Sequence, residues 1–277
     1  MVTWAGRGTL EGTAEGTGGS RAGFEARGTK GLGTMMTPNI QTICSLAVGT
    51  TMIALSSAHA GDTAPVLEVD WIVDGVADAG SLTGSGLGAG VYEYANSTIG
   101  DGFEINWSFI VTDNGASGGF EILSSALAFT NTSDAASVFE IGVLLPVGLA
   151  PGTAFYGGSI SGSLTGDIDG GLLATSGDSA LFAALVDGET IATLYDAPFG
   201  LATAPFESAN LAAEAFGEPI PGLEHAAAQE SMSIELDFEL GAGDQFTVSS
   251  SYVAQVPAPG VLALLGLGGL ASRRRRA

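Results

Sequence analysis

The chain has 277 residues, of which 30 are acidic and only eight are basic, giving a formal net charge of −22. Glu11, Glu15 and Glu25 precede the first apolar run, and the other 27 acids lie between residues 61 and 256, where there is no Lys or Arg. Such a segment repels phosphate groups, which excludes nucleic acid and anionic membrane surfaces as its partners.

The first 34 residues are rich in Gly and Thr and show no apolar periodicity. They hold half of the basic residues of the chain. Residues 1–34 are therefore predicted either to be disordered or to precede the true start of the protein, at Met35 or Met36.

Residues 35–60 are predicted to be a signal peptide. The apolar run ICSLAVGTTMIAL at 43–55 is too short for a bilayer core of about 30 Å but suits the core of a signal peptide. Ala58 and Ala60 give the small-x-small pattern that precedes cleavage, so the mature chain is expected to begin at Gly61.

Residues 61–255 are long enough for one sizeable core, and nothing demands a second domain. Alternating apolar and polar residues predict strands over 66–75, 90–97, 103–113, 120–134 and 137–147. Short strands with Gly-rich turns favour an all-β fold, an antiparallel β-sandwich of the jelly-roll or immunoglobulin-like type.

Two later segments complete the expected domain. Residues 206–217 are predicted to be helical, with Ser208 as the N-cap and Gly217 as the terminator. Residues 231–256 are expected to form a hairpin around the turn GAGD, whose second strand continues directly into the C-terminal segment.

The C-terminal segment 256–277, VPAPGVLALLGLGGLASRRRRA, combines prolines, an apolar run and an arginine cluster. A short hydrophobic helix over 261–272 would be about 18 Å long, well below the roughly 30 Å needed to cross a bilayer. The arginines favour the cytoplasmic side, so the acidic domain is expected on the opposite side.

This order of features closely resembles the PEP-CTERM sorting signal of Gram-negative bacteria, in which a Val-Pro-Glu-Pro box precedes a transmembrane-like run and terminal arginines. By position, Val256, Pro257 and Pro259 match the box, and Ala258 stands where the family has Glu. The arginine cluster corresponds to Arg273, Arg274, Arg275 and Arg276. The resemblance covers about 22 residues. It implies recognition by an exosortase, a membrane cysteine transpeptidase, and removal of the hydrophobic tail.

The loop GDIDGG is the candidate cofactor site, because Asp167 and Asp169 offer hard oxygen ligands of the kind that calcium prefers. A solvated acidic turn explains the same residues, and no other cofactor is expected. An EF-hand is excluded, since Leu172 stands where its glycine is required.

Other candidates for catalysis are weaker. Ser117 lies in a G-x-S-x-G pattern, but between two predicted strands, where a hairpin loop is expected instead of a nucleophile elbow. His225 is the one histidine after Gly61 and is expected in an exposed polar insert. Trp71, Trp107 and Tyr92 fit either sugar stacking or, at alternating strand positions, the core.

We therefore expect an exported protein of the outer surface or extracellular matrix of a Gram-negative-type bacterium, with a structural or interaction role and no enzymatic activity. Its expected partners are signal peptidase and an exosortase, with transient association with the inner membrane through the C-terminal segment. The resemblance implies a setting of exopolysaccharide and biofilm. The alternative is a surface-displayed module that binds or hydrolyses carbohydrate.

Overall fold

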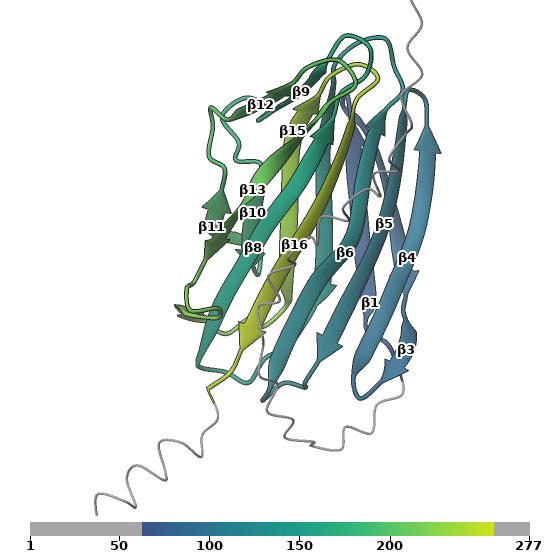
Figure 1. Cartoon of the computed structure of the whole chain (residues 1–277). Helices are drawn as coiled ribbons and strands as arrows, with labels where there is room; N and C mark the ends of the chain where they lie inside the picture. The colour runs from purple at the N-terminus through teal and green to yellow at the C-terminus, as the bar shows by residue number, and fades with distance from the viewer. Residues whose placement is uncertain (1–62, 258–277) are drawn as a thin grey trace, which may run out of the picture. The chain divides into compact units, whose positions relative to one another are not determined.

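The computed structural model describes residues 63–257, which form sixteen β-strands with no helix among them (Figure 1). Every strand pairing is antiparallel, and the strands form two sheets of eight. Sheet 1 has the order β11-β10-β15-β7-β1-β2, with β9 paired to β15 and β12 to β9. Sheet 2 has the order β13-β8-β16-β6-β5-β4-β3, with β14 paired to β8. The all-β, antiparallel prediction is confirmed.

The strands of each sheet have the following bounds. Sheet 1 contains β1 (Val66–Val73), β2 (Val76–Thr83), β7 (Ser137–Pro146), β9 (Gly171–Ala174), β10 (Phe182–Val186), β11 (Glu189–Leu194), β12 (Gly200–Thr203) and β15 (Ser231–Leu240). Sheet 2 contains β3 (Ser85–Gly88), β4 (Val91–Gly100), β5 (Phe103–Asp113), β6 (Gly119–Asn131), β8 (Thr153–Thr165), β13 (Ser208–Phe216), β14 (Leu223–Ala226) and β16 (Gln245–Gln255).

One hydrophobic core lies between the two sheets. Alternation along each strand sends every second side chain inward, as in β1, where the buried residues are Leu67, Val69, Trp71 and Val73. At the centre, the ring of Phe129 from sheet 2 lies 5.0 Å from Phe238 and 5.9 Å from Phe139 of sheet 1. The two sheets therefore pack face to face, an arrangement consistent with a β-sandwich.

The predicted hairpin over 231–256 is wrong, although both of its strands exist. β15 lies in sheet 1 between β7 and β10, whereas β16 lies in sheet 2 between β6 and β8. The turn at GAGD carries the chain from one sheet to the other. The apolar faces of the two strands then meet across the core, where the rings of Phe238 and Phe246 are 5.3 Å apart.

The predicted helix over 206–217 is also wrong, because Ser208–Phe216 forms the strand β13. The segment pairs with β8 along most of its length and buries Leu211 in the core. Ser208 does not cap a helix; its hydroxyl hydrogen-bonds Thr165 Oγ1 at 3.0 Å. Backbone pairing with a neighbouring strand thus outweighs the helix propensity of this Ala-rich segment.

Candidate functional site

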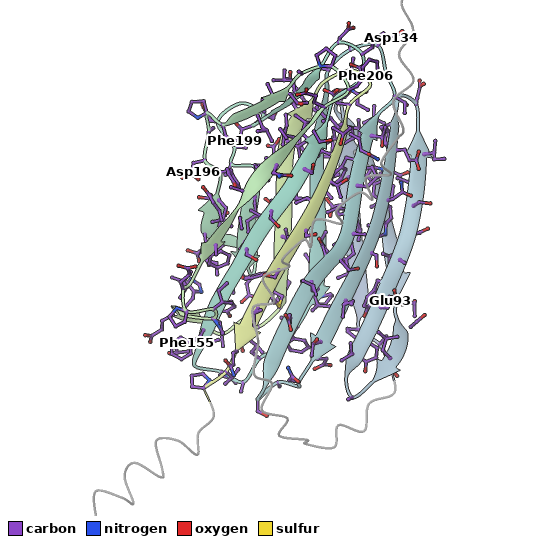
Figure 2. All side chains as sticks on the ribbon, in the orientation of Figure 1. Glu93, Asp134, Phe155, Asp196, Phe199 and Phe206 are labelled. Atoms are coloured by element: carbon purple, nitrogen blue, oxygen red, sulfur yellow. The ribbon has the colours of Figure 1, made fainter. Side chains whose placement is uncertain are left out.

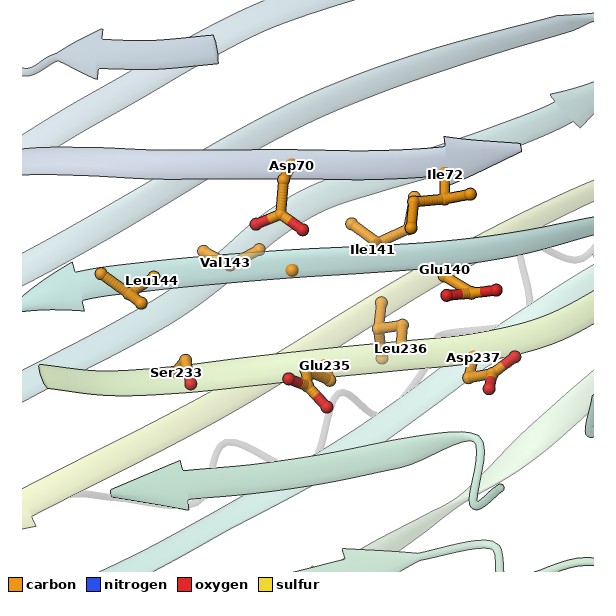
Figure 3. A pocket seen from close by; sticks show the side chains of 11 residues that line it. Asp70, Ile72, Glu140, Ile141, Val143, Leu144, Ser233, Glu235, Leu236 and Asp237 are labelled. Atoms are coloured by element: carbon orange, nitrogen blue, oxygen red, sulfur yellow. The ribbon is translucent and has the colours of Figure 1, made fainter. Parts of the chain in front are cut away.

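A groove of about 230 Å³ crosses the outer face of sheet 1, over the central strands β1, β7 and β15 (Figure 3). Four carboxylates line it: Asp70 from β1, Glu140 from β7, and Glu235 and Asp237 from β15. These side chains point outward because their chain neighbours, such as Trp71 and Leu236, point into the core. We call these four residues and the floor beneath them the acidic groove.

Strand register brings the carboxylates into rows across the sheet. Asp70 is paired with Gly142, and Gly142 with Glu235, so Asp70 and Glu235 lie on either side of the same glycine. With strands about 4.8 Å apart, their Cα atoms are about 10 Å apart. In the next row, Glu140 and Asp237 are direct neighbours. Residues far apart in the sequence thus form one charged surface.

Gly142 makes room for the carboxylate of Asp70. A Cβ atom at position 142 would lie 2.5 Å from Oδ1 and 2.7 Å from Oδ2 of Asp70. Any larger residue would push the carboxylate out of the groove. The glycine therefore forms the floor between Asp70 and Glu235, the two carboxylates labelled on either side of β7 in Figure 3.

The charges in the groove oppose one another. Burial, followed by repulsion from Asp70 and Asp237, raises the pKa of Glu235 above its ordinary value. Oδ1 of Asp237 is buried and has no hydrogen-bond partner within the described chain. Because residues 63–257 contain no Lys or Arg, nothing in them neutralises these acids. The groove suits cations and hydroxyl donors, and it repels anionic ligands.

The two predicted calcium ligands lie in one turn. Oδ1 of Asp167 accepts a hydrogen bond from the backbone N–H of Asp169 at 2.8 Å, so this carboxylate stabilises the turn itself. Behind it, Oδ1 of the buried Asp244 accepts the backbone N–H of Asp167 at 3.2 Å. Among residues 63–257, no group of three or more His, Cys, Asp or Glu side chains is placed to hold a metal ion. Calcium binding by Asp167 and Asp169 stays a prediction.

Ser117 lies exposed in the turn that joins the paired strands β5 and β6, so the hairpin-loop interpretation is confirmed. The expectation of an exposed insert at His225 is wrong. This residue lies in β14, which pairs with β8, and its ring is half-buried with its centroid 6.1 Å from that of Tyr156. The structure does not make Ser117 and His225 neighbours, because Ser117 lies in the β5–β6 turn whereas His225 lies in β14, and β16 and β8 separate β6 from β14.

The aromatic residues considered for sugar stacking belong to the core. Trp71, Trp107 and Tyr92 are at most 8% exposed, and the rings of the two tryptophans are 5.3 Å apart between the sheets. Their side chains therefore face away from any ligand on the outer surfaces.

The described chain ends at the first two residues of the proposed sorting box. β16 ends at Gln255, Val256 packs against the core, and Pro257 is exposed. Pro259, the four arginines Arg273 to Arg276, the proposed signal-peptide residues Ala58 and Ala60, Gly61, and the proposed C-terminal helix lie outside the described residues. Within residues 63–257 there is no helix long and apolar enough to cross a membrane.

The acidic groove was missed by reasoning from sequence. Its signal is present locally, because VLEVDWIV, SVFEIGVLLP and SMSIELDFEL each alternate acids with apolar residues. The order β15-β7-β1, which joins the three segments, is not visible in any one of them.

Comparison with known proteins found no family model and no curated protein that matches this chain.

Proposed function

We propose that this protein is exported, processed at both ends and sorted by an exosortase to the cell surface or extracellular matrix, where it has a structural or interaction role linked to exopolysaccharide. The observation that supports the proposal is the position at which the folded domain ends and the proposed sorting signal begins. The last strand, β16, is paired on both sides until Gln255, and the Val256–Pro259 box follows immediately. Cleavage near the box would leave the whole sandwich intact.

The placement of that junction also supports surface display. Gln255 pairs with Phe155, so the tail leaves the domain at the end where Phe155 lies. Figure 2 places Phe206 and Asp134 at the opposite end of the two sheets. A domain attached through its processed C-terminus at this end would therefore present the loops around Phe206 and Asp134 outward.

We infer further that the sandwich is closer to a jelly roll than to an immunoglobulin fold. The chain crosses between sheets repeatedly, from β6 to β7, from β7 to β8 and from β15 to β16. In sheet 1, β7 pairs with β15, and in sheet 2, β8 pairs with β16. Two successive pairs folded over together in this way are typical of a jelly roll.

Intact-mass measurement of the protein secreted by its native host tests the processing. We expect a species that begins at Gly61 and lacks all four arginines. Replacing Pro257 and Pro259 by Ala should leave the tail attached, whereas Pro205→Ala, at an exposed proline remote from the box, should be processed normally. A mature mass that still includes residues 261–277 would show that the tail is a permanent anchor and contradict the sorting proposal.

The acidic groove favours the second candidate, a module that hydrolyses a neutral polysaccharide. Glycosidases use two carboxyl groups, one of them with a raised pKa as the general acid. Asp70 and Glu235 flank Gly142, and the pKa of Glu235 is raised. If the wild type released reducing sugars from a neutral polysaccharide and Glu235→Gln did not, the domain would be an enzyme. Equal absence of release from both would favour the structural role.

A further inference from the structure

The edge strands of the two sheets are protected by different contacts on the two sides of the domain. On one side, the edge strands β11 and β13 are joined through Tyr195, the residue after β11. Its backbone N–H donates to Oε2 of Glu214 at 3.0 Å, and its hydroxyl donates to the carbonyl of Ala212. The pairing of β13 with β8 also shifts register between Leu211 and Glu214. Contacts between the sheets and a bulge thus protect these edges from other strands.

On the other side, the hydroxyl of Tyr94 on β4 donates to the carbonyl of Pro65, just before β1, and this contact does not involve β2. β2 pairs only with β1 among the described strands, and all but two of its eight residues are more than a third exposed. β4 is covered by the short strand β3 only from Val91 to Glu93. The chain passes from β2 to β3 through Gly84, so both edges lie on the same side of the molecule.

The hairpin register fixes which backbone groups on β2 are free. β1 and β2 are joined by the two-residue turn Asp74–Gly75, so Val73 and Val76 form a hydrogen-bonded pair. Pairs then alternate, and the even-numbered residues of β2 bond to β1. The N–H and C=O groups of Ala77, Ala79 and Ser81 therefore point away from the sheet, toward any strand that approaches.

The N–H of Ala79, the middle one of these three residues, already donates a hydrogen bond to a side chain of β2 itself. Oδ1 of Asp78 accepts the N–H of Ala79 at 2.8 Å. The same arrangement occurs on β4, where Oδ1 of Asn96 accepts the outward N–H of Ser97 at 2.9 Å. Two independent edge strands thus use the preceding Asp or Asn residue to satisfy the donor that a new strand would need.

Among residues 63–257, no other feature of β2 itself opposes pairing. Its sequence, VADAGSLT, has no Lys and no Pro, the residues that most often protect an edge, and Asp78 is its only charged residue. Its backbone is continuous and regular over all eight residues. A second copy offers the same open edge, and two such edges are self-complementary about a two-fold axis.

We propose that β2 is a pairing edge for β2 of a second copy of this chain, and that Asp78 keeps it closed by occupying the N–H of Ala79. Antiparallel pairing of the two edges would join both copies of sheet 1 into one continuous sheet. The proposal concerns the folded domain and is independent of export and sorting.

Sedimentation velocity of the processed, secreted protein tests this proposal. The measurement is made at several protein concentrations and several salt concentrations. Asp78→Ala removes the carboxylate and its hydrogen bond, and Asp78→Asn removes only the charge. We expect Asp78→Ala to dimerise with a dissociation constant lower by on the order of tenfold than the wild type, because the N–H of Ala79 in each copy is then free to donate across the interface. Asp78→Asn should stay close to the wild type, as Asn96 does the same task on β4.

A second variant locates the interface and guards against a folding artefact. Ala79→Pro in the Asp78→Ala background removes the outward N–H without disturbing β1, because that N–H does not bond to β1. It should restore the monomer, with an unchanged far-UV CD spectrum. Equal association of Asp78→Ala and Asp78→Asn would assign the effect to charge alone and overturn the proposal, as would a monomeric Asp78→Ala at high salt.

Discussion

The buried carboxylate of Asp244 holds the backbone of Asp167 from the far side of a turn. Its Oδ1 accepts the N–H of Asp167 at 3.2 Å, and its Oδ2 accepts the N–H of Leu172 at 2.8 Å. Asp244 is 1% exposed and is the last residue of the GAGD turn that crosses between the sheets. A single side chain thus fixes the candidate calcium turn to the connection between β15 and β16.

Asp244→Ala should therefore be strongly destabilising. Two backbone donors would lose their acceptor, at a cost of about 1–3 kcal/mol for each that becomes buried without a partner. Urea unfolding should show a loss of about 2–4 kcal/mol. The control is Asp169→Ala in the same turn, whose exposed side chain should matter by less than about 0.5 kcal/mol. Equal effects of the two variants would contradict this account.

Glu235→Gln should stabilise the protein at neutral pH. The raised pKa of Glu235 means that the folded state keeps a proton where the unfolded chain has lost it. The protonated carboxyl group of Glu235 thus contributes to stability below the ordinary Glu pKa. This contribution is lost as the pH rises through the pKa that Glu235 has in the folded protein. Urea midpoints across the acid-to-neutral range should show the advantage of the variant growing with pH. Glu189→Gln, on the edge strand β11, controls for loss of one charge.

The contribution of Asp187 to stability should depend on pH in the opposite direction to that of Glu235. Burial raises the pKa of Asp187, but hydrogen bonds from the backbone N–H groups of Gln229, Ser231 and Glu230, and the charge of His225, outweigh this and lower it. The stability it provides is present above the ordinary Asp pKa and is lost as the pH falls through the folded value. Asp187→Asn should flatten the acid side of the stability profile. An unchanged acid slope would show that these hydrogen bonds do not favour the charged form.

The melting temperature should rise with added salt, since ions screen the repulsion among the acids of the domain. Millimolar calcium should raise it further, at matched ionic strength, if Asp167 and Asp169 bind the ion. The double variant Asp167→Asn, Asp169→Asn keeps the amide acceptor for the turn and should lose only the calcium-specific rise. A curve indifferent to both salt and calcium would refute the electrostatic argument.

Ser117→Ala and His225→Ala should leave any measured activity of the secreted protein unchanged. Ser117 is exposed in a hairpin turn, so its replacement should also leave stability unchanged within about 0.5 kcal/mol. His225→Ala removes a half-buried ring from the edge of Tyr156 and should lower the melting temperature slightly. Loss of a hydrolytic activity in either folded variant would overturn the non-enzymatic proposal.

The strands that alternation identified are those with large inward side chains. The predicted segment 103–113 coincides with β5, and 137–147 with β7, because Phe109, Val111 and Phe139 give a clear period of two. β8 was not recognised, although it is one of the longest strands. Its inward positions include Gly158 and Gly162, where rings of Phe216 and Phe246 from neighbouring strands occupy the space. Its periodicity is therefore hidden until the neighbouring strands are known.

The sequence by itself determined the β class and the acidic exterior, because alternation and charge are properties of consecutive residues and need no knowledge of partners. Only the tertiary structure decided that β15 and β16 lie in different sheets, that Ser208–Phe216 is a strand, and that Asp70 and Glu235 share a floor at Gly142. Each of these depends on pairing between segments distant in the chain. Such pairing is chosen by the burial of both apolar faces in one core, a global free energy that no local pattern encodes.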